Sequence, residues 1–82
     1  MRYVIWLSDR TLKSYSKDNE SVYGYWTGKN YIVQGELFPI ADRSITSRTK
    51  VYRSKAMAER GLKACLERGY AYVIDGEVRP LD

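Results

Sequence analysis

The residue types that most often carry catalysis are scarce in this 82-residue chain. It contains no histidine and a single cysteine, Cys65. A histidine general base, a Ser-His or Cys-His nucleophile pair, a histidine metal site, an intrachain disulfide and a cysteine-rich zinc site are therefore all excluded. Catalysis would have to rest on carboxylate, lysine or tyrosine side chains, and the ten acidic residues form no recognisable pair. We therefore predict a protein that is not an enzyme, with no cofactor and no small-molecule substrate.

Two segments could in principle hold an ion. Residues 24–30 superficially resemble a phosphate-binding loop, but only three residues separate the two glycines, and asparagine follows the lysine. A phosphate-binding loop needs four residues there and a Ser or Thr after the lysine, so we interpret the segment as a strand and its turn. Asp75 and Glu77 could hold a divalent cation, but a solvated turn is the simpler interpretation. We assign no catalytic residue and no metal ligand.

Positive charge is concentrated in one part of the sequence. The chain carries a net charge of +4, and residues 42–68 contain eight basic and three acidic residues, a net charge of +5. Such a segment could steer an anionic partner, either a phosphate backbone or an acidic protein surface. The alternative is an ordinary solvated loop and helix face. The basic residues that we select as partner-binding candidates are Arg43, Arg48, Lys50, Arg53 and Lys55.

The sequence Arg53-Ser54-Lys55 opens the predicted helix. Cations in the first turn of a helix oppose the helix dipole, so two of them beside the cap residue are unexpected. Together with the amino end of the helix they could bind an oxyanion or a phosphate group. The alternative is that both side chains extend into water.

Aromatic residues are the second candidate group. The chain has eight tyrosines, two tryptophans and one phenylalanine, which suit a core, a protein interface or base stacking equally well. In the predicted strand, Tyr23 and Tyr25 share one face and Trp26 lies on the other. A core of this size cannot use every aromatic residue, so we expect one sheet face to expose several. We add Tyr23, Tyr25 and Trp26 to the partner-binding candidates.

Alternating apolar and β-branched residues predict extended structure in the first half of the chain. We expect a turn over residues 27–30 and a bulge at Gly35. We also expect Pro39 to end the extended run, because proline cannot donate to a central ladder. A polar surface loop over residues 41–48 and a short extended segment over 49–52 then follow. The predicted strands are residues 2–8, 22–26 and 31–34.

The clearest element is an amphipathic helix over residues 55–68. Ser54 is a suitable N-cap, and Gly69 stands where a C′ glycine is common. Gly61 lies on the apolar stripe, which indicates a close approach to the sheet. The stripe recurs with helical spacing and consists of Ala58, Gly61, Leu62, Cys65 and Leu66.

The end of the chain predicts a strand over residues 70–74, a turn at 75–76 and a short returning arm over 77–79. The resulting order is β-β-β-α-β. We therefore predict a single domain over residues 1–82 of the α+β class, with a small antiparallel sheet and one amphipathic helix packed on one face. The apolar run at the start is too short for a secretory signal, and no stretch approaches the ~18 apolar residues of a membrane span. We expect a cytoplasmic protein with no membrane partner.

Residues 23–74 resemble small uncharacterised proteins of phages and prophages. The resemblance rests on Tyr-Trp-Thr-Gly-Lys at 25–29 and on Lys-Val-Tyr-Arg-Ser-Lys-Ala-Met-Ala-Glu at 50–59, where Ser-Lys opens a helix that packs on a sheet. It implies a compact accessory protein of a mobile element, similar to anti-CRISPR and other anti-defence inhibitors. Many of those inhibitors are acidic mimics of nucleic acid, whereas this chain is basic.

These observations predict a non-enzymatic binding module. The leading version is a phage-type accessory or inhibitor protein that docks on a bacterial protein or nucleoprotein complex. The alternative is a protein that binds nucleic acid directly, through the basic loop and helix face with exposed tyrosines. For a phage protein, the expected compartment is the host cytoplasm.

Overall fold

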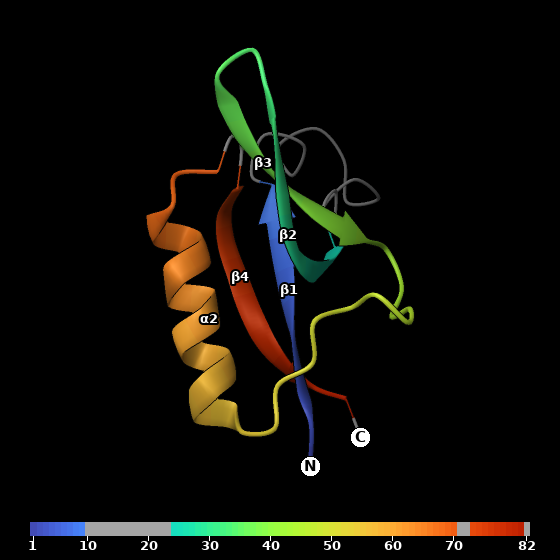
Figure 1. The fold of residues 1–82 in the computed structure, drawn as a ribbon. Coiled ribbons are helices and arrows are strands. Elements are labelled where there is room, and N and C mark those ends of the chain that lie inside the picture. The colour runs from blue at the N-terminus through green and yellow to red at the C-terminus, as the bar shows by residue number, and fades with distance from the viewer. Residues whose placement is uncertain (10–23, 71–72, 82) are drawn as a thin grey trace.

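A computed structural model describes residues 1–9, 24–70 and 73–81 of the chain (Figure 1). Within these residues it shows a four-stranded antiparallel sheet and one helix, which confirms the predicted α+β class and the β-β-β-α-β order. Within the sheet the strands follow the order β3-β2-β1-β4, so the connection that contains the helix crosses from one edge of the sheet to the other. The elements in chain order are β1 (Tyr3–Asp9), β2 (Gly24–Val33), β3 (Glu36–Asp42), α2 (Lys55–Glu67) and β4 (Val73–Pro80).

Strand β1 occupies the middle of the sheet because it is apolar on both faces. Val4, Ile5 and Leu7 are fully buried. On the face that α2 covers, Ile5 and Leu7 pack in one core with Trp26, Cys65 and Tyr70, and Leu37, Tyr52 and Leu62 pack around it. Cys65, which the sequence places on the apolar stripe of the helix, is fully buried in this core.

The helix has nearly the predicted bounds, because its signals are local. The Ser54 hydroxyl accepts a hydrogen bond from the backbone N–H of Met57 (3.2 Å), and Gly69 beyond the last turn has a φ of 76°. A Cβ at Gly61 would lie 2.8 Å from Tyr52 Cζ and 3.2 Å from Ile5 Cδ1. The expected close approach is therefore confirmed, and it brings α2 against both β1 and the segment that precedes the helix.

The predicted turn over residues 27–30 is wrong, because β2 continues through it with an irregularity. Trp26 pairs with Ala41 and Asn30 pairs with Pro39, so three residues of β2 stand opposite one residue of β3. Gly28 provides the positive φ, 89°, at this kink. Beyond Trp26, β2 leaves β1, and Tyr52 bridges to Tyr3 in its place.

The real turn of this hairpin is at Gln34 and Gly35, where we had expected a bulge. Both residues have positive φ, 51° and 83°, which is the conformation of a two-residue hairpin turn that matches the twist of its strands. Pro39 lies inside β3 rather than at its end. Because β3 is an edge strand, it tolerates a residue without an N–H.

The end of the chain also differs from the prediction. Strand β4 runs without a turn through Asp75 and Gly76 and pairs with β1 along its length. Gly76 is required there by space: a Cβ would lie 2.7 Å from the Trp6 carbonyl oxygen and 2.8 Å from Leu62 Cδ1. Leu66, expected on the buried stripe, is 40% exposed, because the helix packs on the sheet through Ala58 and Cys65.

Candidate functional site

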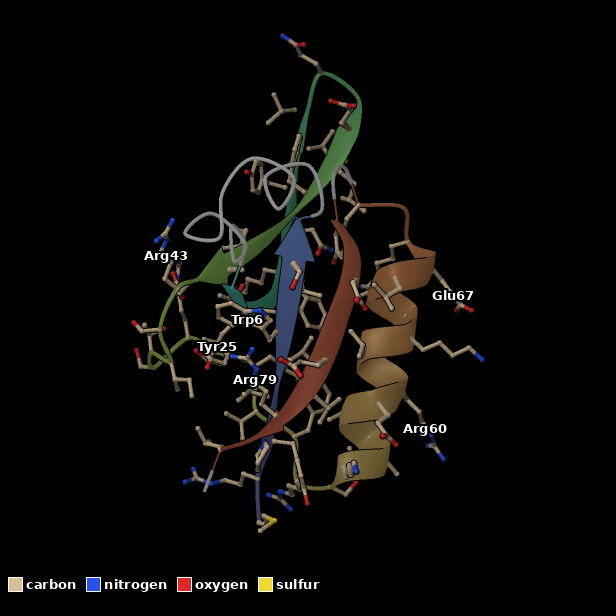
Figure 2. All side chains as sticks on the ribbon, turned by 180° about the vertical axis from the view of Figure 1, so that it is seen from behind. Trp6, Tyr25, Arg43, Arg60, Glu67 and Arg79 are labelled. Carbon is tan, nitrogen blue, oxygen red and sulfur yellow. The ribbon has the colours of Figure 1, made fainter. Side chains whose placement is uncertain are left out.

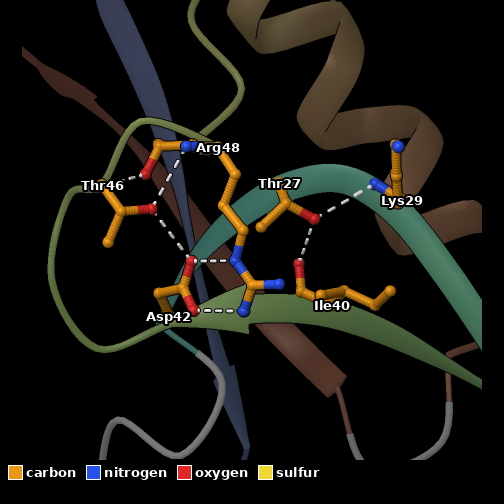
Figure 3. Close-up of polar contacts among 7 residues, drawn as sticks. Thr27, Lys29, Ile40, Asp42, Thr46 and Arg48 are labelled. Carbon is orange, nitrogen blue, oxygen red and sulfur yellow. Dashed lines mark hydrogen bonds and ion pairs between the residues drawn. The ribbon is translucent and has the colours of Figure 1, made fainter.

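The basic loop between β3 and α2 is held by its own hydrogen bonds (Figure 3). Arg48 donates through Nε to Asp42 Oδ2 (2.9 Å) and through Nη2 to Asp42 Oδ1 (2.6 Å). The Thr46 hydroxyl donates to Asp42 Oδ2 and accepts from the Arg48 backbone N–H. The buried Thr49 accepts from the backbone N–H of Thr46. The loop is thus built around one carboxylate, with a bidentate arginine partner.

The ion pair with Asp42 gives Arg48 a structural role instead of the predicted role in partner binding. Its hydrogen bonds to Asp42 hold the pKa of that carboxyl below its usual range and raise the pKa of the guanidinium. The charge of Arg48 is therefore balanced within the loop. Among the basic candidates, Arg48 has a structural role, because it orders the loop between β3 and α2.

The other four basic candidates are exposed: Arg43, Lys50, Arg53 and Lys55. Within the described part of the chain, no ion pair engages Arg43, Arg53 or Lys55. Lys50 Nζ lies 5.5 Å from the centroid of the Tyr52 ring. Arg43 directly follows β3, whereas Arg53 and Lys55 flank the helix start at the other end of the loop, which Figure 1 shows running between them. The structure therefore spreads these charges over the length of the loop.

The three aromatic candidates separate from one another. Trp26 belongs to the core and is 5% exposed, so it offers no ring face to a partner. Tyr25 lies on the sheet face that α2 leaves uncovered, which we call the outer face, and is half-buried there. Tyr23 lies outside the described residues.

The outer face carries a cluster of aromatic and charged side chains that the candidates only partly include. Trp6 and Tyr25 are cross-strand neighbours, with ring centroids 4.7 Å apart in an edge-to-face arrangement. Arg79 from β4 places its Cζ 4.3 Å from the Trp6 ring centroid and donates to the Tyr25 hydroxyl (3.2 Å). It also pairs with Glu77 (2.6 Å). These four residues form the outer-face cluster.

Figure 2 shows how the labelled residues of this cluster lie. Trp6, Tyr25 and Arg79 gather on the sheet, whereas Arg60 and Glu67 project from the helix at the side. Arg43 stands at the β3 end of the same face, directly after Asp42, the cross-strand partner of Tyr25. The outer-face cluster therefore has one basic candidate, Arg43, at its rim.

Trp6 and Arg79 were missed because their proximity depends on strand register. The alternation of Trp6 with Ile5 and Leu7 already placed its side chain opposite the core face. Nothing local connects it to Arg79, which we had assigned to a returning arm beyond a turn. Had residues 73–80 been predicted as one strand beside β1, Trp6 and Arg79 would have been predicted as neighbours.

Metal-ligand groups and the Cys65 thiol were the remaining candidates for chemistry among the described residues. Among them, no group of three or more His, Cys, Asp or Glu side chains is arranged to hold a metal ion. Burial raises the pKa of the Cys65 thiol to about 11, so the thiol stays protonated at neutral pH and is a poor nucleophile. No helix in the described segments is both long and apolar enough to cross a bilayer.

Comparisons of the chain with protein-family models, with curated proteins and with solved structures found no match.

Proposed function

We propose that this protein is a non-enzymatic binding module that docks on another protein through the outer face of its sheet. The outer-face cluster is the observation that supports this proposal. Trp, Tyr and Arg are the residue types that contribute most strongly at the centres of protein interfaces. Here all three lie in contact, on a sheet face that the described helix does not cover.

The charges of this face favour a protein partner with acidic groups. Arg79 and Arg48 are each paired with a carboxylate, so they contribute hydrogen-bonding geometry and little net charge. Arg43 at the rim makes no such pair among the described residues and can steer an acidic surface during encounter. Burial of Trp6 and Tyr25 would then hold the complex, because apolar contact depends little on salt.

The biological setting in this proposal is that of a phage accessory or inhibitor protein, which docks on a bacterial protein or nucleoprotein complex in the host cytoplasm. This part comes from the resemblance of residues 25–29 and 50–59 to small phage and prophage proteins. The compact, crosslink-free α+β fold suits such a stoichiometric role, since it presents several surfaces on few residues.

The test is affinity capture from a bacterial lysate, with nuclease present, followed by binding measurements on the purified partner. Arg79→Gln removes the guanidinium over Trp6, and Arg43→Gln removes the rim charge. We expect each to weaken binding about tenfold or more. Arg60→Gln, which removes an exposed charge from the helix, is the matched control and should bind like the wild type. Equal binding by Arg79→Gln and the wild type, at unchanged melting temperature, would contradict the proposal.

Direct binding of nucleic acid is a second candidate function. The observation in its favour is the exposed positive charge of Arg43, Lys50 and Arg53 along the loop and of Lys55 at the start of α2. If these residues contact phosphates, short DNA or RNA should bind at low salt, and the logarithm of affinity should fall linearly with the logarithm of salt concentration. Fluorescence anisotropy at about 50 mM salt that detects no binding would remove this candidate.

A further inference from the structure

Strand β4 forms one edge of the sheet. Among the described residues, it has a strand, β1, on one side only. An edge strand presents a row of backbone N–H and C=O groups on its open side, and these groups can pair with a strand of another chain. Whether β4 can pair in this way depends on which of its N–H groups point outward and whether they already have an acceptor.

The register against β1 shows which backbone groups of β4 point outward. The Leu81 N–H donates to the Arg2 carbonyl (2.8 Å), and the same register continues along the strand. In an antiparallel pair, hydrogen-bonded positions alternate with positions that face away. Positions 79 and 77 therefore turn their N–H and C=O groups toward β1, whereas positions 76, 78 and 80 turn theirs toward the open side.

Two of these three outward positions offer no N–H group to another strand. The Gly76 N–H donates to Asp75 Oδ1 (2.7 Å), and Pro80 has no N–H group. At most one donor, that of Val78, is then left for an added strand. The Asp75 carboxylate is exposed, so it holds the Gly76 N–H at the surface, where another chain would otherwise meet it.

The opposite edge of the sheet is closed in a similar way. The two-residue turn at Gln34 and Gly35 makes the flanking pair, Val33 and Glu36, a hydrogen-bonded one. By alternation, position 38 faces β2, and positions 37 and 39 face outward. Pro39 therefore stands at an outward position of β3, as Pro80 does in β4. Both edges of the sheet thus lack donors at positions that strand addition would use.

The β4 edge is otherwise suited to a second copy of the same strand. If two copies of β4 paired antiparallel about Val78, Glu77 of each copy would lie opposite Arg79 of the other, and unlike charges opposite each other stabilise a strand pair. The Val78 N–H groups would bond across the centre, and each Gly76 N–H would donate to the Pro80 carbonyl of the other copy. The carboxylate that already accepts from Gly76 prevents this last pair of bonds.

We propose that Asp75 guards the β4 edge: its carboxylate withholds the Gly76 N–H from a second copy of β4 and so keeps the chain monomeric. This inference stands independently of the proposed function. It adds to that function that a partner meets the outer face through side chains, because the backbone of the β4 edge is closed to strand addition.

Sedimentation velocity of the full-length chain over a range of concentrations tests this role. We expect the wild type to be monomeric and Asp75→Ala to dimerise with a dissociation constant lower than that of the wild type by about tenfold or more, because both Gly76 N–H groups become available. Asp75→Asn is the matched control: its amide oxygen can accept the same hydrogen bond without the charge, so this variant should stay monomeric. A dimeric wild type, a monomeric Asp75→Ala, or equal dimerisation of Asp75→Asn and Asp75→Ala would each overturn the proposal.

A second substitution shows whether that dimer forms through β4. In the Asp75→Ala background, Glu77→Lys would place like charges opposite each other across the two strands, so the dimer should weaken about tenfold or more. Glu67→Lys makes the same charge change on the exposed surface of α2 and should leave the dimer unchanged. A dimer that Glu77→Lys does not weaken, or that Glu67→Lys weakens equally, forms through another surface and would overturn the proposal.

Amide hydrogen exchange in dilute, monomeric protein measures the guarding hydrogen bond itself. Corrected for the neighbouring side chain, the Gly76 amide should exchange about tenfold or more faster in Asp75→Ala than in the wild type and in Asp75→Asn. The Val78 amide, which faces the same side of β4, is the reference and should change little. Equal exchange of the Gly76 amide in all three proteins would show that Asp75 does not hold this N–H, and the proposal would fail while the proposed function remained.

Discussion

Replacing Gly61 with alanine should destabilise the protein, although alanine is the better helix former. At an exposed position in the middle of a helix, alanine is favoured over glycine by about 1 kcal/mol. At Gly61 the added methyl group would clash with the Tyr52 hydroxyl and lie 2.8 Å from Tyr52 Cζ and 3.2 Å from Ile5 Cδ1. Overpacking of this kind costs about 1–3 kcal/mol. The net change in the free energy of unfolding is therefore a loss of about 1 kcal/mol.

The Tyr52→Phe background tests the cause. Removing the hydroxyl relieves the worst contact but leaves the ring carbon, so Gly61→Ala should cost clearly less there. The difference between the two backgrounds is the coupling energy, which for residues in contact is about 0.5–3 kcal/mol. If Gly61→Ala costs the same in both backgrounds, the coupling energy is zero and the added methyl group does not contact the Tyr52 hydroxyl.

Urea unfolding followed by circular dichroism measures these free energies, and a loss of about 1 kcal/mol corresponds to roughly 4–8 °C in melting temperature for a domain of this size. Lys63→Ala and Lys63→Gly are the matched controls. Lys63 is exposed near the middle of the helix, so their difference gives the alanine preference without any packing cost. If Gly61→Ala stabilises the protein by that same amount, the close approach of α2 to β1 is refuted.

Three further predictions concern the helix and its cysteine. Leu62→Ala should lower the free energy of unfolding by about 2 kcal/mol, the low end for a core leucine, because Leu62 is only partly buried. Leu66→Ala should lower it by about 0.5 kcal/mol or less, because Leu66 is exposed. If urea unfolding shows the larger loss for Leu66→Ala, the helix is rotated relative to the sheet. The double reversal Arg53→Glu and Lys55→Glu should melt at or above the wild-type temperature, because glutamate suits the helix dipole. It should weaken binding to the captured protein less than Arg43→Gln does, because the helix start lies at the other end of the loop from the outer-face cluster; a stronger loss than that of Arg43→Gln would place the helix start inside the interface. Burial raises the pKa of the Cys65 thiol from 9.0 to about 11, so the unfolded chain loses this proton first as pH rises. The free energy of unfolding should therefore fall between about pH 9 and pH 11 more steeply in the wild type than in Cys65→Ala. Parallel pH profiles for the two proteins would show that the thiol is not desolvated.

Local signals predicted the parts of the fold that depend on neighbours in sequence. The helix, its Ser54 cap and its Gly69 terminus follow from side chains within a few turns of one another. The predicted strand over residues 2–8 is likewise close to β1, because its alternating apolar and β-branched residues are a local signal. The basic loop was also recognised from sequence, and its candidates Arg43, Lys50, Arg53 and Lys55 are exposed as a binding surface requires.

Only the tertiary structure shows which glycines lie in turns and which lie inside strands. Gly28 and the pair Asp75–Gly76 both match turn signals, yet Gly28 lies at a kink inside β2 and Gly76 lies inside β4, against the Trp6 carbonyl. The conformational freedom of glycine permits a turn, a bulge or a close backbone contact. Which of these forms depends on the strand that pairs with the segment containing the glycine.

Strand pairing also determines which side chains meet in the candidate site. Sequence placed Trp6 opposite Ile5 and Leu7, because alternation along a strand is fixed by backbone geometry. The contact of Trp6 with Arg79 depends on the register of β4 against β1, which pairs residues about seventy positions apart. Likewise, only three-dimensional packing directed Trp26 into the core and paired Arg48 with Asp42. Residue types and periodicity thus determined which side chains were available, and long-range strand pairing determined which of them meet at the surface.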